Sequence, residues 1–379
     1  MTRVVVAGGG PAGLYFSYLW KRRHPDHDVT LFEQNPPDAT FGFGVVFSSQ
    51  AMDFLRADDP ETADLICARM EMWSDMTLAY RGENVVIDGV GFSAIGRLDL
   101  LLILQKQARA AGVNLQYDHC LHSLKELPEH DILVVADGVN SLFRRSQEGD
   151  FLTSVSYLDE KFAWFGTTKR FETLTQTFIE TPFGPFNAHH YRYSPTMSTF
   201  IVECDRATWL RADLDKRSET DSRALCEALF KDTLDGHPLV ANKSLWRNFP
   251  WIWNDRWSHG KMVLLGDALH TAHYSIGSGT RLALEDATSL VNALDEHPED
   301  IREGFAAYEK QRRPVVEKLV RAARESASWY SYVPEHMREE PLDFAYSYIT
   351  RSGRIDDVRL RQMSPNFMKR YAAQERSTR

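Results

Sequence analysis

The stretch Arg3-Val-Val-Val-Ala-Gly-Gly-Gly-Pro-Ala-Gly13 decides the fold of this 379-residue chain. Its first five residues are a short β-branched run, which is typical of a buried strand in a parallel sheet. The segment GGGPAG at residues 8–13 follows directly, and a helix is predicted from there to about Arg23. A second strand is predicted over residues 28–33. The order strand, glycine-rich turn, helix and strand predicts a Rossmann-like dinucleotide-binding unit.

The turn and the acid that follows it have the residue types that hold a dinucleotide. Gly8 permits the tight turn, Gly10 lets the backbone approach a pyrophosphate, and Gly13 lets the helix pack closely on the strand. The helix N-terminus adds free N–H groups and the positive end of the helix dipole. Glu33 ends the second predicted strand, twenty residues after Gly13, and would accept hydrogen bonds from a ribose hydroxyl.

Two later motifs each follow a predicted buried strand. Residues 131–138 read DILVVADG and continue as VNSLFR. Residues 260–267 read GKMVLLGD and continue as ALHTAHYSIGSG to Gly279, where a helix with an apolar stripe is predicted to begin. In this order and spacing, the three motifs resemble those of the single-component flavoprotein aromatic hydroxylases.

This resemblance implies a role for each motif. The first would hold the pyrophosphate and adenosine of FAD, and Asp137-Gly138 would lie near the pyrophosphate and the path of the nicotinamide. Asp267 would contact the ribityl chain, and the helix after Gly279 would point its N-terminus at the isoalloxazine, where its dipole stabilises negative charge. Arg97, which precedes an apolar helix, matches the arginine that contacts FAD in this family.

Five further stretches resemble one subgroup, which contains salicylyl-CoA 5-hydroxylase, the N-terminal half of 2-aminobenzoyl-CoA monooxygenase and the tryptophan hydroxylase of violacein biosynthesis. The stretches are residues 42–48 (GFGVVFS), 188–193 (AHHYRY), 198–203 (STFIVE), 246–250 (WRNFP) and 273–279 (HYSIGSG). The resemblance covers residues 1 to about 330. The cofactor-binding residues that it implies are Gly8, Gly10, Pro11, Ala12, Gly13, Glu33, Gln34, Gly44, Val45, Arg97, Asp137, Gly138, Gly266, Asp267, Ser275, Gly277, Ser278, Gly279 and Thr280.

The predicted fold class is α/β, with a Rossmann-like FAD-binding domain, an inserted mixed β-sheet and C-terminal helices. The FAD-binding domain must be discontinuous because its motifs span residues 8 to 286, and we expect it to comprise residues 1–75, 96–150 and 255–305. Alternating polar and apolar runs predict a substrate-binding sheet over 76–95 and 151–254. A helix from Arg302 begins a C-terminal segment, 306–379, whose tail we expect to be irregular and rich in arginine.

The reaction that the resemblance implies is hydroxylation of an aromatic ring. NAD(P)H would reduce FAD, and reduced FAD with O₂ would form a C4a-hydroperoxide that transfers its terminal oxygen to an electron-rich ring. The chain has only one G-x-G-x-x-G, so we expect the nicotinamide to visit the flavin without a domain of its own. No sequence motif indicates a dedicated pocket for the 2′-phosphate that distinguishes NADPH from NADH. NADH is slightly favoured as the co-substrate.

A base near the substrate would help to activate the ring, and histidine is the natural candidate. In the predicted strand at 188–193, alternation places His189, Tyr191 and Tyr193 on one face and His190 and Arg192 on the other. The resemblance favours the first three residues as the catalytic set that faces the pocket. The alternative is that His189 is a core histidine and that the two tyrosines only pack.

The distribution of charged residues along the chain indicates which classes of ligand the protein could bind. The net charge of −9 argues against a nucleic-acid partner, whereas residues 302–379 carry 16 Lys or Arg against 11 Asp or Glu. This excess would suit the phosphates of CoA, with candidate ligands Arg312, Arg313, Arg321 and Arg324. Three possibilities stay open: an aryl-CoA hydroxylase of the salicylyl-CoA type, a hydroxylase of a free or carrier-bound aromatic such as an indole, and a flavoprotein that does not hydroxylate.

No metal site is predicted, since no two cysteines have C-x-x-C spacing and His270 and His273 have no further ligand cluster nearby. The first strand begins at Arg3, which leaves no room for a signal peptide, and no apolar run approaches 18 residues. We therefore expect a cytoplasmic enzyme with a small aromatic substrate, O₂ and no membrane partner. The oligomeric state cannot be predicted from the sequence.

Overall fold

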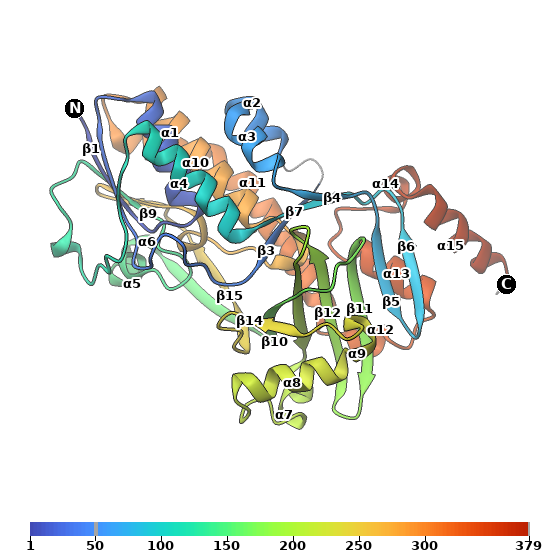
Figure 1. The fold of residues 1–379 in the computed structure, drawn as a ribbon. Coiled ribbons are helices and arrows are strands. Elements are labelled where there is room, and N and C mark those ends of the chain that lie inside the picture. The colour runs from blue at the N-terminus through green and yellow to red at the C-terminus, as the bar shows by residue number, and fades with distance from the viewer. Residues whose placement is uncertain (49–51, 378–379) are drawn as a thin grey trace.

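The computed structural model describes residues 1–48 and 52–377, with side chains described as far as Gln374. Figure 1 shows two lobes, one built on a parallel sheet near the N-terminus and one on a larger sheet, with the C-terminal helices beside the larger sheet. This is the predicted α/β architecture with an inserted mixed sheet, which is confirmed.

The first sheet has six strands in the order β16-β17-β9-β1-β2-β8. Every neighbouring pair is parallel except β16 and β17, as a Rossmann-like sheet requires. Four predicted strands of this sheet, β1, β2, β9 and β17, lie where the apolar runs placed them. The strands are β1 (Arg3–Ala7), β2 (Asp28–Phe32), β8 (Asn114–Gln116), β9 (Ile132–Val135), β16 (Ser258–His259) and β17 (Met262–Leu264).

Helix α1 packs between α4 and α10, and α10 packs on α11. Leu14, Tyr15 and Phe16 of α1 are completely buried, so this helix is part of the core. The helices of this lobe are α1 (Pro11–Arg23), α2 (Asp53–Asp58), α3 (Pro60–Cys67), α4 (Arg97–Ala111), α5 (Leu142–Ser146), α6 (Glu148–Phe151), α10 (Gly279–Glu296) and α11 (Ile301–Tyr330).

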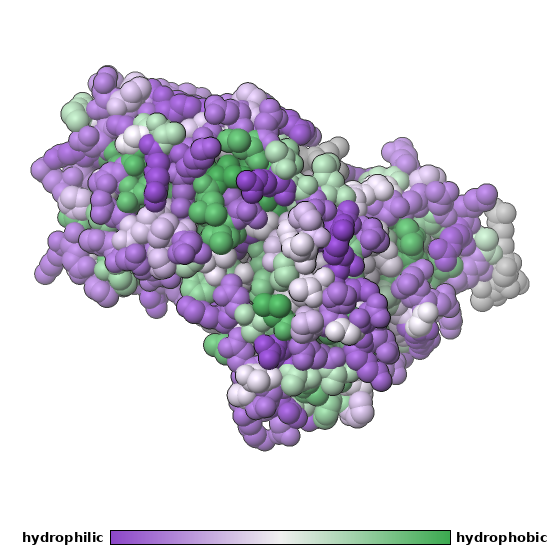
Figure 2. Space-filling model, viewed as in Figure 1, coloured by the Kyte–Doolittle hydropathy of each residue, from purple (hydrophilic) through white to green (hydrophobic). Residues whose placement is uncertain are grey.

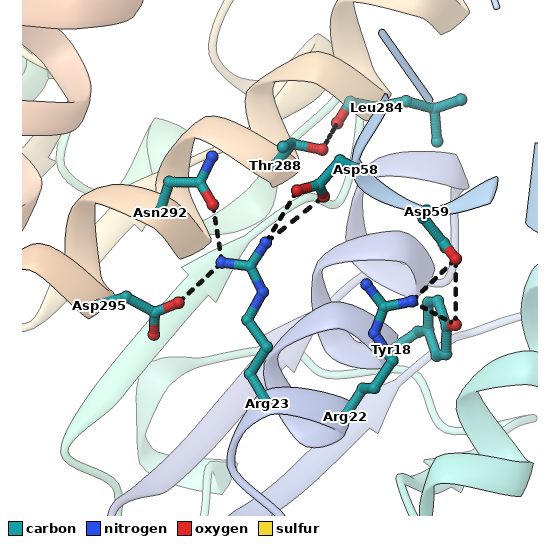
Figure 3. Close-up of polar contacts among 9 residues, drawn as sticks. All are labelled: Tyr18, Arg22, Arg23, Asp58, Asp59, Leu284, Thr288, Asn292 and Asp295. Carbon is teal, nitrogen blue, oxygen red and sulfur yellow. Dashed lines mark hydrogen bonds and ion pairs between the residues drawn. The ribbon is translucent and has the colours of Figure 1, made fainter. Parts of the chain in front are cut away.

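Two arginines at the end of α1 fix the small helices α2 and α3 to the sheet lobe (Figure 3). Arg23 donates to Asp58 of α2 at 3.1 Å and to Asp295 of α10 at 2.7 Å. Arg22 donates at 2.8 Å to Asp59, which has no exposed surface and also caps α3. Because Asp59 is a buried charge, its pairing with Arg22 is needed for this junction to be stable.

The second sheet has the order β14-β10-β13-β12-β11-β5-β6, and β15 also pairs with β10. It is mixed, since β5 and β11 are parallel and the other pairs are antiparallel. Its strands are β5 (Met76–Tyr80), β6 (Glu83–Ile87), β10 (Thr153–Thr167), β11 (Leu174–Thr181), β12 (Gly184–Arg192), β13 (Ser198–Cys204), β14 (Leu239–Ala241) and β15 (Arg247–Asn254). Helices α7 (Arg206–Arg211), α8 (Glu219–Leu229) and α9 (Lys231–Leu234) complete the core on one of its faces.

One boundary of the predicted substrate sheet is wrong. The sequence predicts that 76–95 belongs to that sheet, but β7 (Phe92–Gly96) pairs with β3 (Gly44–Ser48) and β4 (Glu71–Trp73) in a separate three-stranded sheet. The hydrophobic alternation of β7 shows that it is a strand but carries no information on which strands it pairs with.

The C-terminal segment is also more regular than expected. After α11 it forms α12 (Val333–His336), α13 (Pro341–Thr350), α14 (Asp357–Met363) and α15 (Pro365–Ser377). Phe344 and Tyr348 of α13 pack on Phe178 of β11, so the tail covers the sheet and does not lie loose on the surface. The prediction of an irregular tail is therefore wrong, because these apolar residues bury against a sheet distant in sequence.

Most of the face shown in Figure 2 is hydrophilic, and hydrophobic residues gather over α4, where Leu102 is exposed. Within residues 1–48 and 52–377, no helix combines the length and the apolar character that a membrane crossing requires.

Candidate active site

Two glycines of the glycine-rich turn are required by close packing, whereas a third has open space beside it. A Cβ on Gly8, whose φ is +107°, would lie 2.3 Å from the carbonyl oxygen of Ala136. A Cβ on Gly13 would lie 2.1 Å from the carbonyl oxygen of Gly8, whereas a Cβ on Gly10 would meet nothing within 4 Å. Gly8 and Gly13 are thus needed for the turn itself, and the space beside Gly10 fits a pyrophosphate at the N-terminus of α1.

The carboxylate of Glu33 lies at this turn. It accepts hydrogen bonds from the N–H of Gly9 at 2.7 Å and from the N–H of Asn35 at 2.9 Å. These contacts orient the carboxylate beside the predicted pyrophosphate position, as binding of a ribose hydroxyl requires. Gln34, the next residue, is exposed at the same edge of the sheet.

Asp137 and Gly138 follow β9, the neighbour of β1. One carboxylate oxygen of Asp137 accepts from the N–H of Leu142 at 2.8 Å, and the other is buried without a partner among the described residues. Burial raises the pKa of Asp137 above its ordinary value. Space is open at Gly138, where a Cβ would meet nothing within 4 Å. A buried unpartnered oxygen beside an open glycine fits a bound cofactor.

A facing pair of opposite charges marks the second part of the predicted cofactor site. Asp267 follows β17 in the Gly266-Asp267 motif and is exposed. Arg97 is the first residue of α4. Burial lowers the pKa of Arg97, and attraction to Asp267 opposes that effect. Arg97 is partly exposed and Asp267 is exposed, so both side chains are accessible to a ligand.

The segment 270–279, which we call the flavin loop, leads into α10. Its Ser275 side chain hydrogen-bonds with His273 Nδ1 at 2.9 Å and with Ser326 Oγ of α11 at 2.8 Å. Arg351, after α13, donates to the carbonyl oxygen of Ser275 at 2.8 Å. The predicted residues Gly277, Ser278, Gly279 and Thr280 lie at the end of this loop and the start of α10. The C-terminal segment therefore helps to position the flavin loop, a role that its sequence does not reveal.

The tyrosines of the predicted catalytic set contact β3. The hydroxyl of Tyr191 donates to the carbonyl oxygen of Gly44 at 2.9 Å, and a Cβ on Gly44 would lie 2.5 Å from Tyr193. Burial raises the pKa of Tyr193 to about 12 and raises that of Tyr191 further, so both phenols are neutral at physiological pH. These contacts hold Gly44 and Val45 in place, and a catalytic role for the two tyrosines stays a prediction.

The two histidines of β12 lie on opposite faces of the sheet, as alternation predicts. The ring of His190 lies 3.8 Å from that of Phe171, and its Nε2 pairs with Thr177 Oγ1 at 2.9 Å. His189 lies toward the flavin loop, with its ring 5.5 Å from the ring of Tyr274. His190 thus packs in the core, whereas His189 lies on the face toward the flavin loop, and its catalytic role stays a prediction.

A cavity lies between β12 and β13 on one side and the flavin loop and α11 on the other. Polar side chains of Asn187, Glu203, His273, Tyr274 and Tyr330 line it together with the apolar residues Leu158, Ala327 and Val333. Glu203 and Asn187 were not predicted as site residues. The signal available was an acid at the end of the apolar run TFIV in residues 199–202.

The four candidate phosphate ligands have different environments. Arg312 is buried and pairs with Asp286 at 2.7 Å and with Glu285 at 2.6 Å, so the prediction that it binds a ligand phosphate is wrong. Arg313 pairs with Glu309 at 2.5 Å. The two remaining arginines, Arg321 and Arg324, are exposed.

Comparison with known proteins agrees with this geometry. Residues 129–323 match the family described as FAD binding domain. The chain is 42% identical to a salicyloyl-CoA 5-hydroxylase from Streptomyces sp, over 92% of this chain and 70% of the relative. It is 36% identical to 3-hydroxy-4-methyl-anthranilyl-(aryl-carrier protein) 5-monooxygenase of Streptosporangium sibiricum, over 93% of this chain and 95% of the relative. It is 33% identical to protodeoxyviolaceinate monooxygenase of Chromobacterium violaceum, over 92% and 94% of the two chains.

Among solved structures, the tetrameric form of 2-methyl-3-hydroxypyridine-5-carboxylic acid oxygenase has the same fold. The TM-score is 0.73 at 18% identity, and the match covers 93% of this chain and 96% of that one. The glycine-rich turn, the Asp137 and Asp267 motifs and the extent of these matches lead to one conclusion: the chain belongs to the FAD-dependent aromatic hydroxylases.

Proposed function

We propose that this enzyme uses NAD(P)H, FAD and O₂ to hydroxylate the ring of an aromatic acyl thioester. The observation that supports the proposal is the cavity between Glu203 of β13 and Tyr274 of the flavin loop, because polar and aromatic side chains line it directly beside the segment that leads into α10. The names of two relatives specify aromatic acyl groups, one on CoA and one on an aryl carrier protein. Both carriers attach the acyl group through a phosphopantetheine thioester.

Bound FAD would supply the redox chemistry, by taking two electrons from NAD(P)H and activating O₂ for transfer of one oxygen atom to the ring. The turn at Gly10 and the carboxylate of Glu33 would hold the adenosine and pyrophosphate end. Asp137, Arg97 and Asp267 would hold the rest of the cofactor along the carboxyl ends of β9 and β17. The first turn of α10 would face the ring system with its free N–H groups.

The chain's own contribution to the reaction is to position the aromatic ring and to exclude water. Burial lowers the pKa of His273 to about 3, so its imidazole is neutral at physiological pH. Burial likewise raises the pKa of Tyr274, which keeps that phenol protonated. The His273 and Tyr274 side chains that face the predicted flavin position are therefore uncharged, and the acidic residues of the cavity are Glu160, Glu203 and Asp205.

Arg321 and Arg324 stay candidates for the phosphates of the thioester arm. Both are exposed on α11, and the guanidinium of Arg324 lies 5.2 Å from the ring centre of Trp251. If they bind phosphate, the double change to Ala raises KM for a CoA thioester with little effect on kcat. Unchanged KM would remove the arginines from the site and leave the hydroxylase assignment standing.

A second candidate substrate is an indole or another aromatic that is not a thioester. The observation that favours it is the 33% identity to protodeoxyviolaceinate monooxygenase over nearly the whole chain. In either case the chemistry is the same, and only the group attached to the ring differs.

The test measures NADH and NADPH oxidation by the FAD-loaded enzyme with salicylyl-CoA, salicylyl carrier protein, free salicylate and tryptophan, and records the product mass. We expect a thioester to stimulate oxidation and to give a product heavier by one oxygen atom. If only tryptophan stimulates NADH or NADPH oxidation, the second candidate substrate is favoured. Peroxide formation at the same rate with every additive, without product, would contradict hydroxylation.

A further inference from the structure

Glu203 is the one acidic side chain of the cavity that lies against the candidate histidine. It lies near the end of β13, directly opposite Asn187 of β12 in the register of the sheet. Asn187 Nδ2 donates a short hydrogen bond to Glu203 Oε2, and His189 Nδ1 lies 3.8 Å from the same oxygen. The three residues are between 4% and 7% exposed, so their contacts are shielded from bulk water.

The positions of these three side chains relative to the cavity determine which of them can contact a ligand. Glu203 and Asn187 line the cavity, and His189 contacts the carboxylate next to them. The expected base, His189, therefore acts on the cavity through Glu203. A carboxylate has about four acceptor positions. Asn187 donates to Oε2, and His189 Nδ1 at 3.8 Å is beyond hydrogen-bond distance, so the carboxylate retains capacity for a further donor.

The charge of Glu203 is unusual for a buried group. Burial alone would raise its pKa, but the contacts with His189, His273 and Tyr274 keep the pKa below its ordinary value, so the carboxylate is ionised at neutral pH. No Lys or Arg forms an ion pair with it in residues 1–48 and 52–377. A buried carboxylate is costly unless paired, and one that faces a cavity without a Lys or Arg partner is typical of a ligand-binding group.

We propose that Glu203 binds the hydroxyl or amino substituent of the substrate ring by accepting its hydrogen bond, and that His189 and Asn187 position the carboxylate for this contact. The inference rests on the proposed function and specifies its site. A carboxylate that accepts an O–H or N–H bond increases electron density on the heteroatom and hence on the ring carbons that receive oxygen. No proton needs to leave the ring substituent for this effect.

The proposal predicts discrimination between rings with and without a donor. A hydrogen bond to a charged group contributes about 1.5–3 kcal/mol, which is a preference of about 10- to 100-fold. The probes are salicylyl-CoA and benzoyl-CoA, which differ only in the ring hydroxyl. Their Kd values are measured with the FAD-loaded enzyme from the change in flavin absorbance, so that no turnover is required.

We expect the wild-type enzyme to bind salicylyl-CoA at least 10-fold tighter than benzoyl-CoA. Glu203→Gln is expected to reduce that ratio to less than threefold while leaving the Kd of benzoyl-CoA unchanged. Glu203→Asp, which retains the charge, should recover part of the ratio, and Asn187→Ala and His189→Asn should each reduce it. Glu180→Gln, an exposed acid of β11 outside the cavity, is the matched control and should leave the ratio as in wild type.

Two results separate this inference from the proposed function. If neither thioester changes the flavin spectrum, the thioester assignment fails, and the same ratio is measured with free salicylate and benzoate. Equal affinities within the pair that binds, or a ratio that survives Glu203→Gln, would overturn the role of Glu203. A general loss of affinity for both probes in that variant would show a structural role only and would also overturn it.

Discussion

Asp286 of α10 and Arg312 of α11 form a buried ion pair in which Oδ1 and Nε lie 2.7 Å apart. His270 contacts the other carboxylate oxygen of Asp286 at 2.8 Å, so the pair also links the two helices to the start of the flavin loop. Burial alone would raise the pKa of Asp286, but His270 and Arg312 hold it below its ordinary value. The contact explains why Arg312 is unavailable to a ligand.

Removal of Arg312 should therefore affect stability more than substrate binding. Arg312→Ala leaves Asp286 as a buried charge with one partner fewer, and we expect a loss of about 3–5 kcal/mol in the free energy of unfolding. Arg321→Ala, on the exposed side of the same helix, should change stability by less than about 0.5 kcal/mol. Urea unfolding with saturating FAD measures both. Equal stabilities of the two variants would contradict the prediction.

The glycine-rich turn allows cofactor binding to be separated from folding. A Cβ at position 10 meets no protein atom within 4 Å, so Gly10→Ala should fold normally and lose FAD affinity by tenfold or more. Gly13→Ala places a Cβ 2.1 Å from the carbonyl oxygen of Gly8 and should reduce the amount of folded protein itself. Circular dichroism of the apoprotein and a fluorescence titration with FAD distinguish the two effects. Normal FAD binding by Gly10→Ala would place the pyrophosphate elsewhere.

Tyr191→Phe tests whether this tyrosine takes part in the reaction or supports β3. The variant removes the hydrogen bond to the carbonyl oxygen of Gly44 and should lower stability by about 0.5–1.5 kcal/mol. Because the phenol already donates to the backbone, we expect the turnover rate to change by less than about threefold, well below the 10²–10⁴-fold effect of a lost acid or base. If the variant lowers the turnover rate by about 10²-fold without loss of stability, Tyr191 has a catalytic role.

Two buried histidines make stability depend on pH. Burial lowers the pKa of His190 well below its ordinary value, and the neighbouring His189 lowers it further. Burial also lowers the pKa of His273, to about 3. The unfolded chain binds protons at these sites near pH 6.5 and the folded chain does not. Their contribution is therefore fully present above about pH 6.5 and is lost as the pH falls toward 3.

Each histidine should reduce the free energy of unfolding by about 1.4 kcal/mol between pH 7.5 and pH 5.5. The double change His190→Phe with Thr177→Val removes one titrating group together with its hydrogen-bond partner, so the loss over this range should be about 1.4 kcal/mol smaller than in wild type. Denaturant titrations at the two pH values provide the measurement. An identical pH dependence in both proteins would show that His190 is not neutral in the fold.

Local patterns in the sequence predicted the parts of the fold that depend on neighbours in the chain. The apolar run before Gly8 predicted β1, and alternation at 188–193 correctly separated His189 from His190. Pairing between distant segments was beyond such patterns. Nothing near Arg312 indicates that Asp286 of another helix neutralises it, and nothing near Arg351 indicates that it reaches the backbone of Ser275.

Glu203 illustrates the same limit within the site. The sequence shows an acid after an apolar run, but only the register of β12 on β13 brings it beside Asn187 and His189. A histidine in a strand pattern predicts acid–base chemistry because its ordinary pKa is near neutral. The burial of the Glu203 carboxylate and its place on the cavity wall depend on tertiary packing, which the sequence pattern does not specify.

Strand β10 connects the two lobes of the molecule. Its first part pairs with β15, which leads into the parallel sheet, and its second part pairs with β13, which carries Glu203. This strand of 15 residues thus connects both lobes by main-chain hydrogen bonds, with a register shift in its pairing to β15 between Tyr157 and Lys161. Enzymes with hinged lobes admit ligands by opening like a clamp. Because β10 pairs with strands of both lobes, we expect the lobes to move together and ligand exchange to depend on local displacement of the flavin loop, which lines the cavity.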